Sequence, residues 1–130
     1  MKDAEQPWWI IGSVAVALHG GSPGRIRDVD VVVSHADARR CFRRLKLANG
    51  AASADPLFRS DLFARWSEPP MEIELMAGLQ VRGPDGWEAL TIRSRVEIRE
   101  GLYVPSRDEL RAILISFGRE KDLRRAATLA

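Results

Sequence analysis

The sequence predicts an α+β fold, a mixed β-sheet with helices packed on it. Apolar runs and period-two alternation mark the strands, apolar residues at helical spacing mark the helices, and their order is β-α-β-α-β-β-β-β-α-α. The 130 residues suffice for one hydrophobic core, and 45% hydrophobic and 29% charged residues are the balance of an ordinary globular protein. We therefore expect residues 1–130 to form a single domain.

The first strand and helix are expected at the start of the chain. Trp8–Ile11 is a bulky apolar run that ends at Gly12, which favours a buried strand. Ser13 has the chemistry of an N-cap and Gly20-Gly21 that of a C-cap. These residues predict a short helix over 13–19.

A second strand and helix follow. The β-branched run Asp28–Ser34 predicts a strand with two acids at its start. Residues 36–47 have amphipathic helical spacing, with Cys41 and Leu45, and also Phe42, as candidates for the inward face. We interpret the basic residues of this helix as a solvated face, with a phosphate-facing patch as the alternative; they are Arg39, Arg40, Arg43, Arg44 and Lys46.

The second half of the chain predicts further strands before it ends in helices. Leu57–Trp66 is a candidate strand, and Met71–Met76 alternates with period two, as half-buried strands do. Gly83–Gly86 is a turn, and Arg93–Arg99 is expected to form a polar edge strand. Ile92, Val96, Ile98 and Leu102 alternate with charged residues there, which suggests a surface for pairing with another chain.

The last two helices are marked by their ends. Ser106 and Glu109 have the spacing of a capping box, which opens a helix that runs to about Phe117. Gly118 separates this helix from a basic one that ends near Leu129.

Composition also bounds the compartment and the class of partner. No apolar run is long enough for a membrane span, and the start of the chain lacks the apolar core of a signal peptide. Cys41 is the only cysteine, which favours a reducing compartment, and we expect the cytoplasm. The net charge of +2 is too small to indicate nucleic-acid binding by itself.

The strongest chemical signal is the pair Asp28 and Asp30. Residues i and i+2 of a strand point to the same side, about 6 to 7 Å apart, so two carboxylates share one face. This arrangement suits a pair of divalent ions, and oxygen ligands favour Mg²⁺ or Mn²⁺. An Asp-x-Asp alone is weak evidence, because such pairs often simply face water.

Gly12 and Ser13 strengthen the interpretation. They lie where the first strand is expected to meet the first helix, a place where free backbone N–H groups favour phosphate. Glycine allows a phosphate to approach the backbone closely, and the Ser13 hydroxyl can donate to it. The simpler alternative is a tight strand-to-helix turn capped by Ser13.

A two-metal site usually needs a third carboxylate, and the strand Met71–Met76 offers two. Glu72 and Glu74 share one face of that strand, opposite Met71, Ile73 and Leu75. We choose Glu74, because it lies deeper in the strand, either as a metal ligand or as the base for an attacking hydroxyl. An ordinary solvated face remains the alternative.

Four blocks of sequence carry a family resemblance: Ile11–Gly20, Arg27–Val33, Glu72–Leu79 and Gly118–Leu123. The first two resemble the signature of the DNA polymerase β-type nucleotidyltransferase superfamily. The third is similar to the strand that carries its third acid, and the fourth to a GR-x-KD-L segment near the end of many members. The chain is most similar to the small bacterial minimal or AbiEii-like group.

The resemblance implies a nucleotidyltransferase fold and a role for each matching position. Gly12 and Ser13 would hold the nucleotide phosphates, and a cluster of three acids would bind Mg²⁺ or Mn²⁺. Arg119 and Lys121 match the terminal motif, where either a phosphate contact or a structural ion pair with Asp122 is expected; we favour the ion pair. The implied metal ligands and catalytic residues are Asp28, Asp30 and Glu74.

The chain departs from the family pattern at several positions. Ile26 and Arg27 stand where relatives commonly have Thr or Ser, and Arg124 and Arg125 stand where an acid is common. The segment 112–116 lacks a lysine that many relatives have, and the third acid is Glu where Asp is common. These changes weaken the expectation of an active catalyst and leave the expected fold intact.

Two functions follow from this reading. The first is an enzyme that transfers a nucleoside monophosphate from an NTP to an acceptor hydroxyl with two metal ions. The second is a catalytically inactive protein of the same fold that acts through protein contact, such as one half of a toxin–antitoxin pair. We also expect a homodimer or a small helical partner, because few residues remain for a second wall around the acceptor. The acceptor could be protein, RNA or a small molecule.

Overall fold

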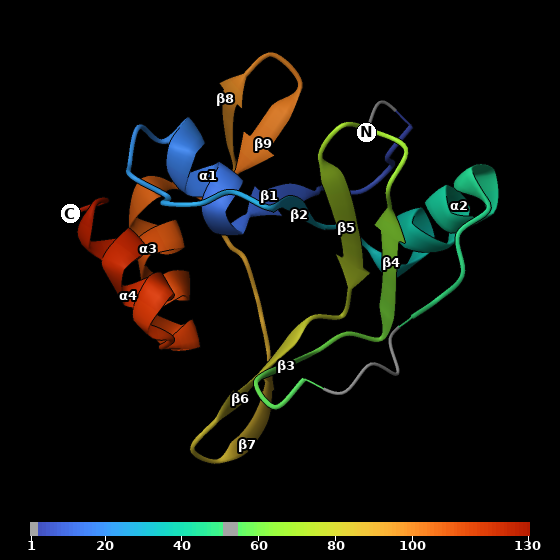
Figure 1. Ribbon diagram of the computed structural model, residues 1–130. Coiled ribbons are helices and arrows are strands. Elements are labelled where there is room, and N and C mark those ends of the chain that lie inside the picture. The colour runs from blue at the N-terminus through green and yellow to red at the C-terminus, as the bar shows by residue number, and fades with distance from the viewer. Residues whose placement is uncertain (1–2, 51–54) are drawn as a thin grey trace.

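The computed structural model describes residues 3–50 and 55–130, and it has the α+β architecture that the sequence predicts (Figure 1). A central four-stranded sheet has the order β1-β2-β5-β4. The strands are β1 (Trp9–Ile11), β2 (Asp28–Val32), β5 (Glu72–Ala77) and β4 (Leu62–Trp66). Only the β2–β5 pair is parallel, so the sheet is mixed as expected.

Helix α1 (Gly12–Leu18) follows β1 without a loop. Ile11 occupies the N-cap position, so the expected cap at Ser13 is wrong; the Ser13 side chain is buried in the first turn. The C-terminal glycines behave as predicted. Gly20 donates its N–H to Ala17 and Gly21 donates to Val16, which is the Schellman pattern, and Gly20 has the positive φ that this ending requires.

Helix α2 (His35–Leu45) is capped by Ser34, whose hydroxyl accepts from the Asp37 backbone N–H. Phe42 and Ala38 form the buried face, whereas Cys41, expected to face inward, is only half buried.

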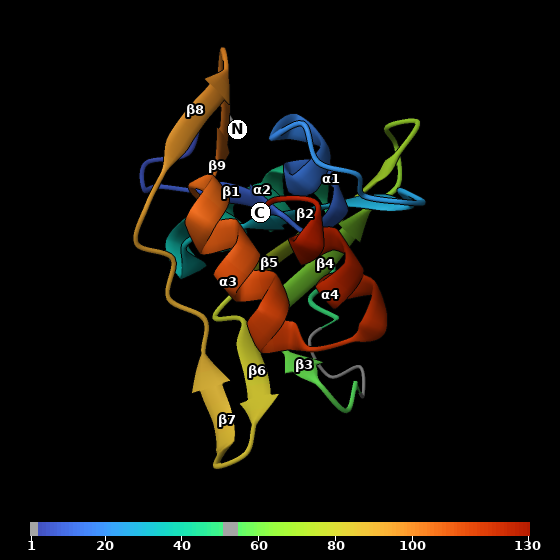
Figure 2. The same ribbon diagram turned by 90° about the vertical axis from the view of Figure 1, so that its left-hand side faces the viewer.

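Leu57–Trp66 is not one strand, which corrects the sequence prediction. It divides into β3 (Phe58–Arg59) and β4, because the chain turns at residues 60–61 and the Asp61 carboxylate pairs there with His35 of α2. Strand β3 joins a second sheet with β6 (Gln80–Gly83) and β7 (Gly86–Ala89). This sheet extends away from the rest of the molecule (Figures 1 and 2).

The expected edge strand at 93–99 is shorter than predicted. Only β8 (Val96–Arg99) forms, paired with β9 (Leu102–Val104). The Glu109 carboxylate accepts hydrogen bonds from the backbone N–H groups of Arg93 and Ser94 and so occupies the groups that would extend the strand. The apolar residues proposed as a pairing surface are partly buried against the core of the same chain, and their pairing with another chain stays a prediction; they are Ile92, Val96, Ile98 and Leu102.

Helices α3 (Arg107–Phe117) and α4 (Glu120–Ala127) pack against each other beside α1 (Figure 2). Ser106 caps α3 as predicted, accepting from the Glu109 N–H, while the Glu109 side chain holds the 93–94 segment rather than closing the capping box. Gly118 ends α3 with a positive φ. Among the helices of the described residues, none has the length and apolar character that crossing a bilayer requires.

The carboxylate of Asp37 ties the start of the chain to α2, and its removal gives a test of the fold. It is 3% exposed and accepts from the N–H groups of Glu5 and Gln6, at 3.1 and 2.9 Å, and from the Arg40 guanidinium. Burial alone would raise the pKa of Asp37, but these hydrogen bonds outweigh it and hold the pKa below its ordinary value.

We expect Asp37→Asn to lower the free energy of unfolding by about 1 to 3 kcal/mol at pH 7, because one backbone N–H loses its acceptor and Arg40 loses its buried anionic partner. The contribution of a lowered carboxyl pKa is present above the unfolded pKa, near 4, and is lost as the pH falls through the folded pKa. Urea unfolding from pH 7 down to pH 3 measures both effects. Asp85→Asn, in the exposed β6–β7 turn, is the matched control, and equal losses in the two variants would contradict the role of Asp37.

Candidate functional site

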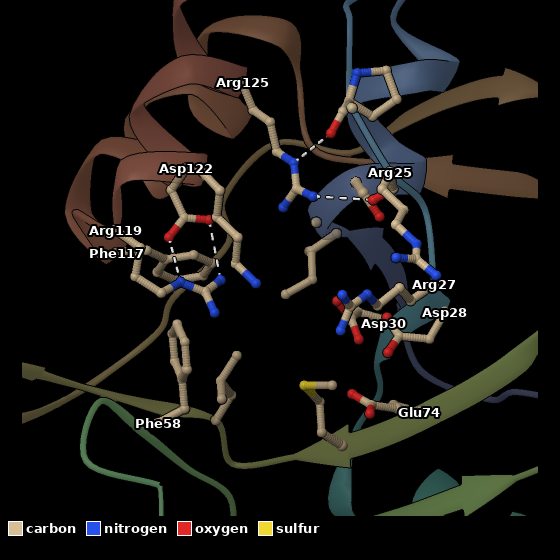
Figure 3. A pocket seen from close by; sticks show the side chains of 18 of the residues that line it. Arg25, Arg27, Asp28, Asp30, Phe58, Glu74, Phe117, Arg119, Asp122 and Arg125 are labelled. Atoms are coloured by element: carbon tan, nitrogen blue, oxygen red, sulfur yellow. Dashed lines mark hydrogen bonds and ion pairs between the residues drawn. The ribbon is translucent and has the colours of Figure 1, made fainter.

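A cavity of about 840 Å³ lies between the central sheet and the C-terminal helices (Figure 3). Residues of β2 and β5 form one side, and α4 with the end of α3 forms the other. The loop from Ser22 to Arg27 lines the cavity between them. We expected too few residues for a second wall around the site, but helix α4 forms such a wall. Every sequence-predicted site residue lines this cavity: Gly12, Ser13, Asp28, Asp30, Glu74, Arg119 and Lys121.

The three predicted acids lie together on the sheet side of the cavity. Asp30 is the register partner of Glu74 across the parallel β2–β5 pair, and Asp28 lies two residues before Asp30 on the same strand. One carboxylate oxygen from each of Asp28, Asp30 and Glu74 lies within 4.8 Å of the others. Such spacing of hard oxygen donors is compatible with divalent-ion binding.

The structure also distinguishes Glu74 from Glu72. The Glu74 side chain is 16% exposed and belongs to the acidic cluster, whereas the Glu72 side chain is 38% exposed. Glu72 accepts a hydrogen bond from the Ser67 hydroxyl at 3.1 Å. Arg65 of β4 lies 3.2 Å from Glu74 and 3.5 Å from Glu72, so it contributes one cation to both.

The proximity of the acids changes the proton affinity of Asp30. Burial, a hydrogen bond with Glu74, and the charges of Asp28 and Glu74 raise the pKa of Asp30 to about 8, with Arg119 acting in the opposite direction. Near neutral pH, Asp30 therefore holds a proton while the cluster lacks a cation. A divalent ion would compete with that proton for the same oxygens.

Gly12 is the position where α1 approaches this cluster. Its φ is +70°, and a Cβ built on it would lie 2.7 Å from a carboxylate oxygen of Asp30. Any side chain at residue 12 would therefore be strained and would displace Asp30. The sequence argument assigned Gly12 to phosphate approach; the structure shows a close approach of Asp30.

Arg119 faces the acids from the other side of the cavity, where it forms the ion pair that the sequence argument favoured. Its Nε and Nη2 donate to the two Asp122 oxygens at 2.6 and 3.1 Å, and Asp122 is 1% exposed. Its guanidinium carbon also lies 4.9 Å from the centre of the Phe58 ring. Lys121 lines the same wall, and no ion pair of Lys121 is found within residues 3–50 and 55–130.

Sequence reasoning missed most of the basic residues in this cavity. They come from segments far apart in the chain and are Arg25, Arg27, Arg59, Arg65, Arg124 and Arg125. Three of them, Arg27, Arg124 and Arg125, stand at the departures from the family pattern, and this was the available signal. The basic run of α2 does not contribute to the lining; Arg40 and Arg44 pair instead with Glu5 and Asp3.

The raised pKa of Asp30 gives a pH test of the cluster. Between about pH 4 and pH 8 the folded protein keeps a proton that the unfolded chain releases, so the metal-free protein loses stability as the pH rises. Asparagine carries no charge and can still donate to Glu74. We therefore expect the Tm of Asp30→Asn to rise above that of the parent as the pH increases, by roughly 10 °C or more between pH 5 and pH 8.

Thermal unfolding in the presence of a chelator measures this difference at each pH. Asp85→Asn removes the same charge from an exposed turn and controls for net charge. A constant difference between Asp30→Asn and the parent from pH 5 to pH 8 would contradict the coupling of the three acids.

Comparison with known proteins supports the fold. The chain is similar to the structure of the putative nucleotidyltransferase TM1012 from Thermotoga maritima, with a TM-score of 0.69, 22% sequence identity, and coverage of 92% of this chain and 78% of that chain. It is also similar to the lincomycin-bound structure of the lincosamide antibiotic adenylyltransferase LnuA, with a TM-score of 0.55, 15% identity, and coverage of 95% and 85%. No family model and no curated protein sequence matches the chain.

At these identities the likeness shows the fold alone, and the AbiEii-like subgroup stays a prediction. The mixed sheet with helices packed on it is the α+β architecture that the sequence predicts. This chain has the nucleotidyltransferase fold.

Proposed function

We propose that this protein is a nucleotidyltransferase that moves a nucleoside monophosphate from an NTP to an acceptor hydroxyl. The observation that carries the proposal is the cluster of Asp28, Asp30 and Glu74 in a cavity lined with arginines. Such a reaction needs carboxylates that hold divalent cations and cationic side chains that hold phosphates. The fold of the neighbouring structures supports the same conclusion.

The residues present fit a pair of Mg²⁺ or Mn²⁺ ions. One carboxylate oxygen from each of the three acids lies within 4.8 Å of the others, and the raised pKa of Asp30 has burial and the nearby negative charges among its causes, which supports binding of cations there. Asp28, Asp30 and Glu74 would hold the ions. The β2–β5 register fixes the separation of these carboxylates. When bound, such ions supply charge neutralisation at the reacting phosphate and lower the pKa of the attacking hydroxyl.

The nucleotide would lie between the two walls of the cavity. Gly12 and Ser13, at the start of α1, line it beside the acids, and Arg119 and Lys121 line it from the opposite side. The bond between Arg119 and buried Asp122 holds that guanidinium in one orientation, so little side-chain entropy is lost when a phosphate binds.

The transfer forms one bond and breaks one. The acceptor oxygen attacks the α-phosphorus, the bond between the α-phosphorus and the bridging oxygen breaks, and pyrophosphate leaves with that electron pair. The hydroxyl proton passes to a carboxylate of the acidic cluster. Arg119 and Lys121 stabilise the negative charge that develops on the departing pyrophosphate.

Our proposal also includes a homodimer or a complex with a small helical protein. Ile115 of α3 and Leu123 of α4 are each 46% exposed, and a partner that covered these helices would bury them. We expect light scattering to give the mass of a dimer, or co-expression with a helical partner to give a stable complex. A chain that is monomeric at high concentration and transfers nucleotides without a partner would exclude this part of the proposal.

Glu74 and Glu72 allow a matched test of the acidic cluster. Calorimetry with Mn²⁺ should show binding to the parent protein and an affinity at least about tenfold lower for Glu74→Gln, because one ligand oxygen is lost. Glu72→Gln removes the same charge from the same face of the same strand, and we expect a change of about threefold or less. Equal effects of the two substitutions would contradict the site.

Transfer itself is measured with an NTP labelled at the α-phosphate and with protein, RNA and small-molecule acceptors. We expect label in one acceptor class with Mg²⁺ or Mn²⁺, and none with Asp28→Asn/Asp30→Asn. Binding of NTP without transfer to any of the three classes would favour the inactive, protein-binding alternative.

A further inference from the structure

The loop from Ser22 to Arg27, which leads into β2, is held by the C-terminal helix. Arg125 of α4 donates from Nε to the Pro23 carbonyl at 2.7 Å and from Nη2 to the Arg25 carbonyl at 3.4 Å (Figure 3). The Ser22 N–H donates to the Thr128 hydroxyl at 3.0 Å. The partners are about 100 residues apart in sequence, so these contacts fix the loop from outside rather than through its own turn.

The start of this loop is packed as well as hydrogen-bonded. A Cβ on Gly21 would lie 2.9 Å from the Thr128 hydroxyl oxygen and 3.0 Å from the Leu129 side chain, so a larger residue would displace these side chains. Arg107 of α3 donates to the carbonyls of His19, Thr128 and Leu129, and so ties both segments to one helix. The loop therefore has a defined position although its own residues are largely exposed.

Two arginines of this loop, Arg25 and Arg27, line the cavity next to the acids. Figure 3 shows both side chains on the side of the cavity where Asp28 and Asp30 lie. Within the described parts of the chain, neither forms an ion pair. The other cavity arginines already have partners. Arg119, Arg65 and Arg124 pair with acids, whereas Arg59 donates to the Gln80 side chain and Arg125 donates to the loop carbonyls.

We propose that Arg25 and Arg27 bind the triphosphate of the nucleotide, and that Arg125 and Thr128 are positioning residues that hold the loop in place. The inference rests on the proposed function, since the anion is the polyphosphate of an NTP. A guanidinium without an acidic partner keeps its donors for a phosphate, and it can bind two phosphate oxygens at once. A loop fixed before the ligand arrives loses less entropy on binding.

Inorganic tripolyphosphate is the probe, because it carries the anion without base, sugar or transfer chemistry. We expect the parent protein to bind it in calorimetry, and Arg25→Gln and Arg27→Gln each to weaken binding by about tenfold. The dependence of affinity on salt should also become less steep in both variants. Arg124→Gln is the control: it removes a cation from the same cavity whose guanidinium already pairs with Glu120, and we expect a change of about twofold or less.

Two further variants test whether Arg125 and Thr128 act by positioning the loop and not by their charge. Arg125→Lys keeps the charge but cannot donate to both loop carbonyls, and Thr128→Val removes the acceptor of the Ser22 N–H without any change in charge. We expect each to weaken tripolyphosphate binding by about three- to tenfold while the affinity for Mn²⁺ stays unchanged. Circular dichroism confirms that the variants are folded.

The outcomes separate this inference from the proposed function. Tripolyphosphate binding that depends on Arg25 and Arg27, in a protein that transfers no nucleotide, would support the inference and overturn the proposed function. Nucleotide transfer by the parent protein, with unchanged tripolyphosphate affinity in Arg25→Gln and Arg27→Gln, would support the proposed function and overturn the inference. A parent protein that binds no tripolyphosphate at millimolar concentration would overturn the inference, and parent-like binding by Arg125→Lys and Thr128→Val would overturn the positioning role.

Discussion

The parallel pairing of β2 with β5 is the constraint on which the rest of this structure depends. It sets Asp30 directly opposite Glu74, and strand geometry places Asp28 on the same face, so three like charges share one small volume. A slip of one residue would turn the acids to the other face and the apolar residues into solvent. Because Val31 and Leu75 are buried partners in the same register, the hydrophobic core enforces the electrostatic arrangement.

Other residues of the cavity accommodate or partly offset this concentration of negative charge. Gly12 provides room for the Asp30 carboxylate, and Arg65 and Arg119 bring cations toward the cluster from β4 and from the start of α4. Arg65 pairs with Glu74 of the cluster itself, whereas Arg119 is bound to Asp122, which limits the positive charge that Arg119 contributes. Burial, the hydrogen bond with Glu74 and the neighbouring carboxylate charges still raise the pKa of Asp30 to about 8, so Asp30 keeps a proton near neutral pH.

Local features of the sequence predicted local features of the structure. The Ser106 cap, the glycines after α1 and the alternation in β5 depend on neighbouring residues, and they were predicted correctly. Period two places Glu72 and Glu74 on one face but cannot decide between them, because the surroundings of each glutamate depend on contacts with other strands. Pairing across about 100 residues is invisible to periodicity, and so the part of Arg125 in the cavity was missed. The break in Leu57–Trp66 was missed because the contact with His35 of α2 is likewise long-range.

The departures from the family pattern acquire a joint explanation in this structure. An acid near the end of the chain could not donate to the loop carbonyls, whereas Arg125 donates to two of them, and this fixes the loop that carries Arg27 into the cavity. A serine or threonine before the aspartates would offer a neutral hydroxyl there, while Arg27 offers a cation. The two arginines, nearly one hundred positions apart, thus act on the same loop. Their positions support the proposal that this loop binds an anionic ligand.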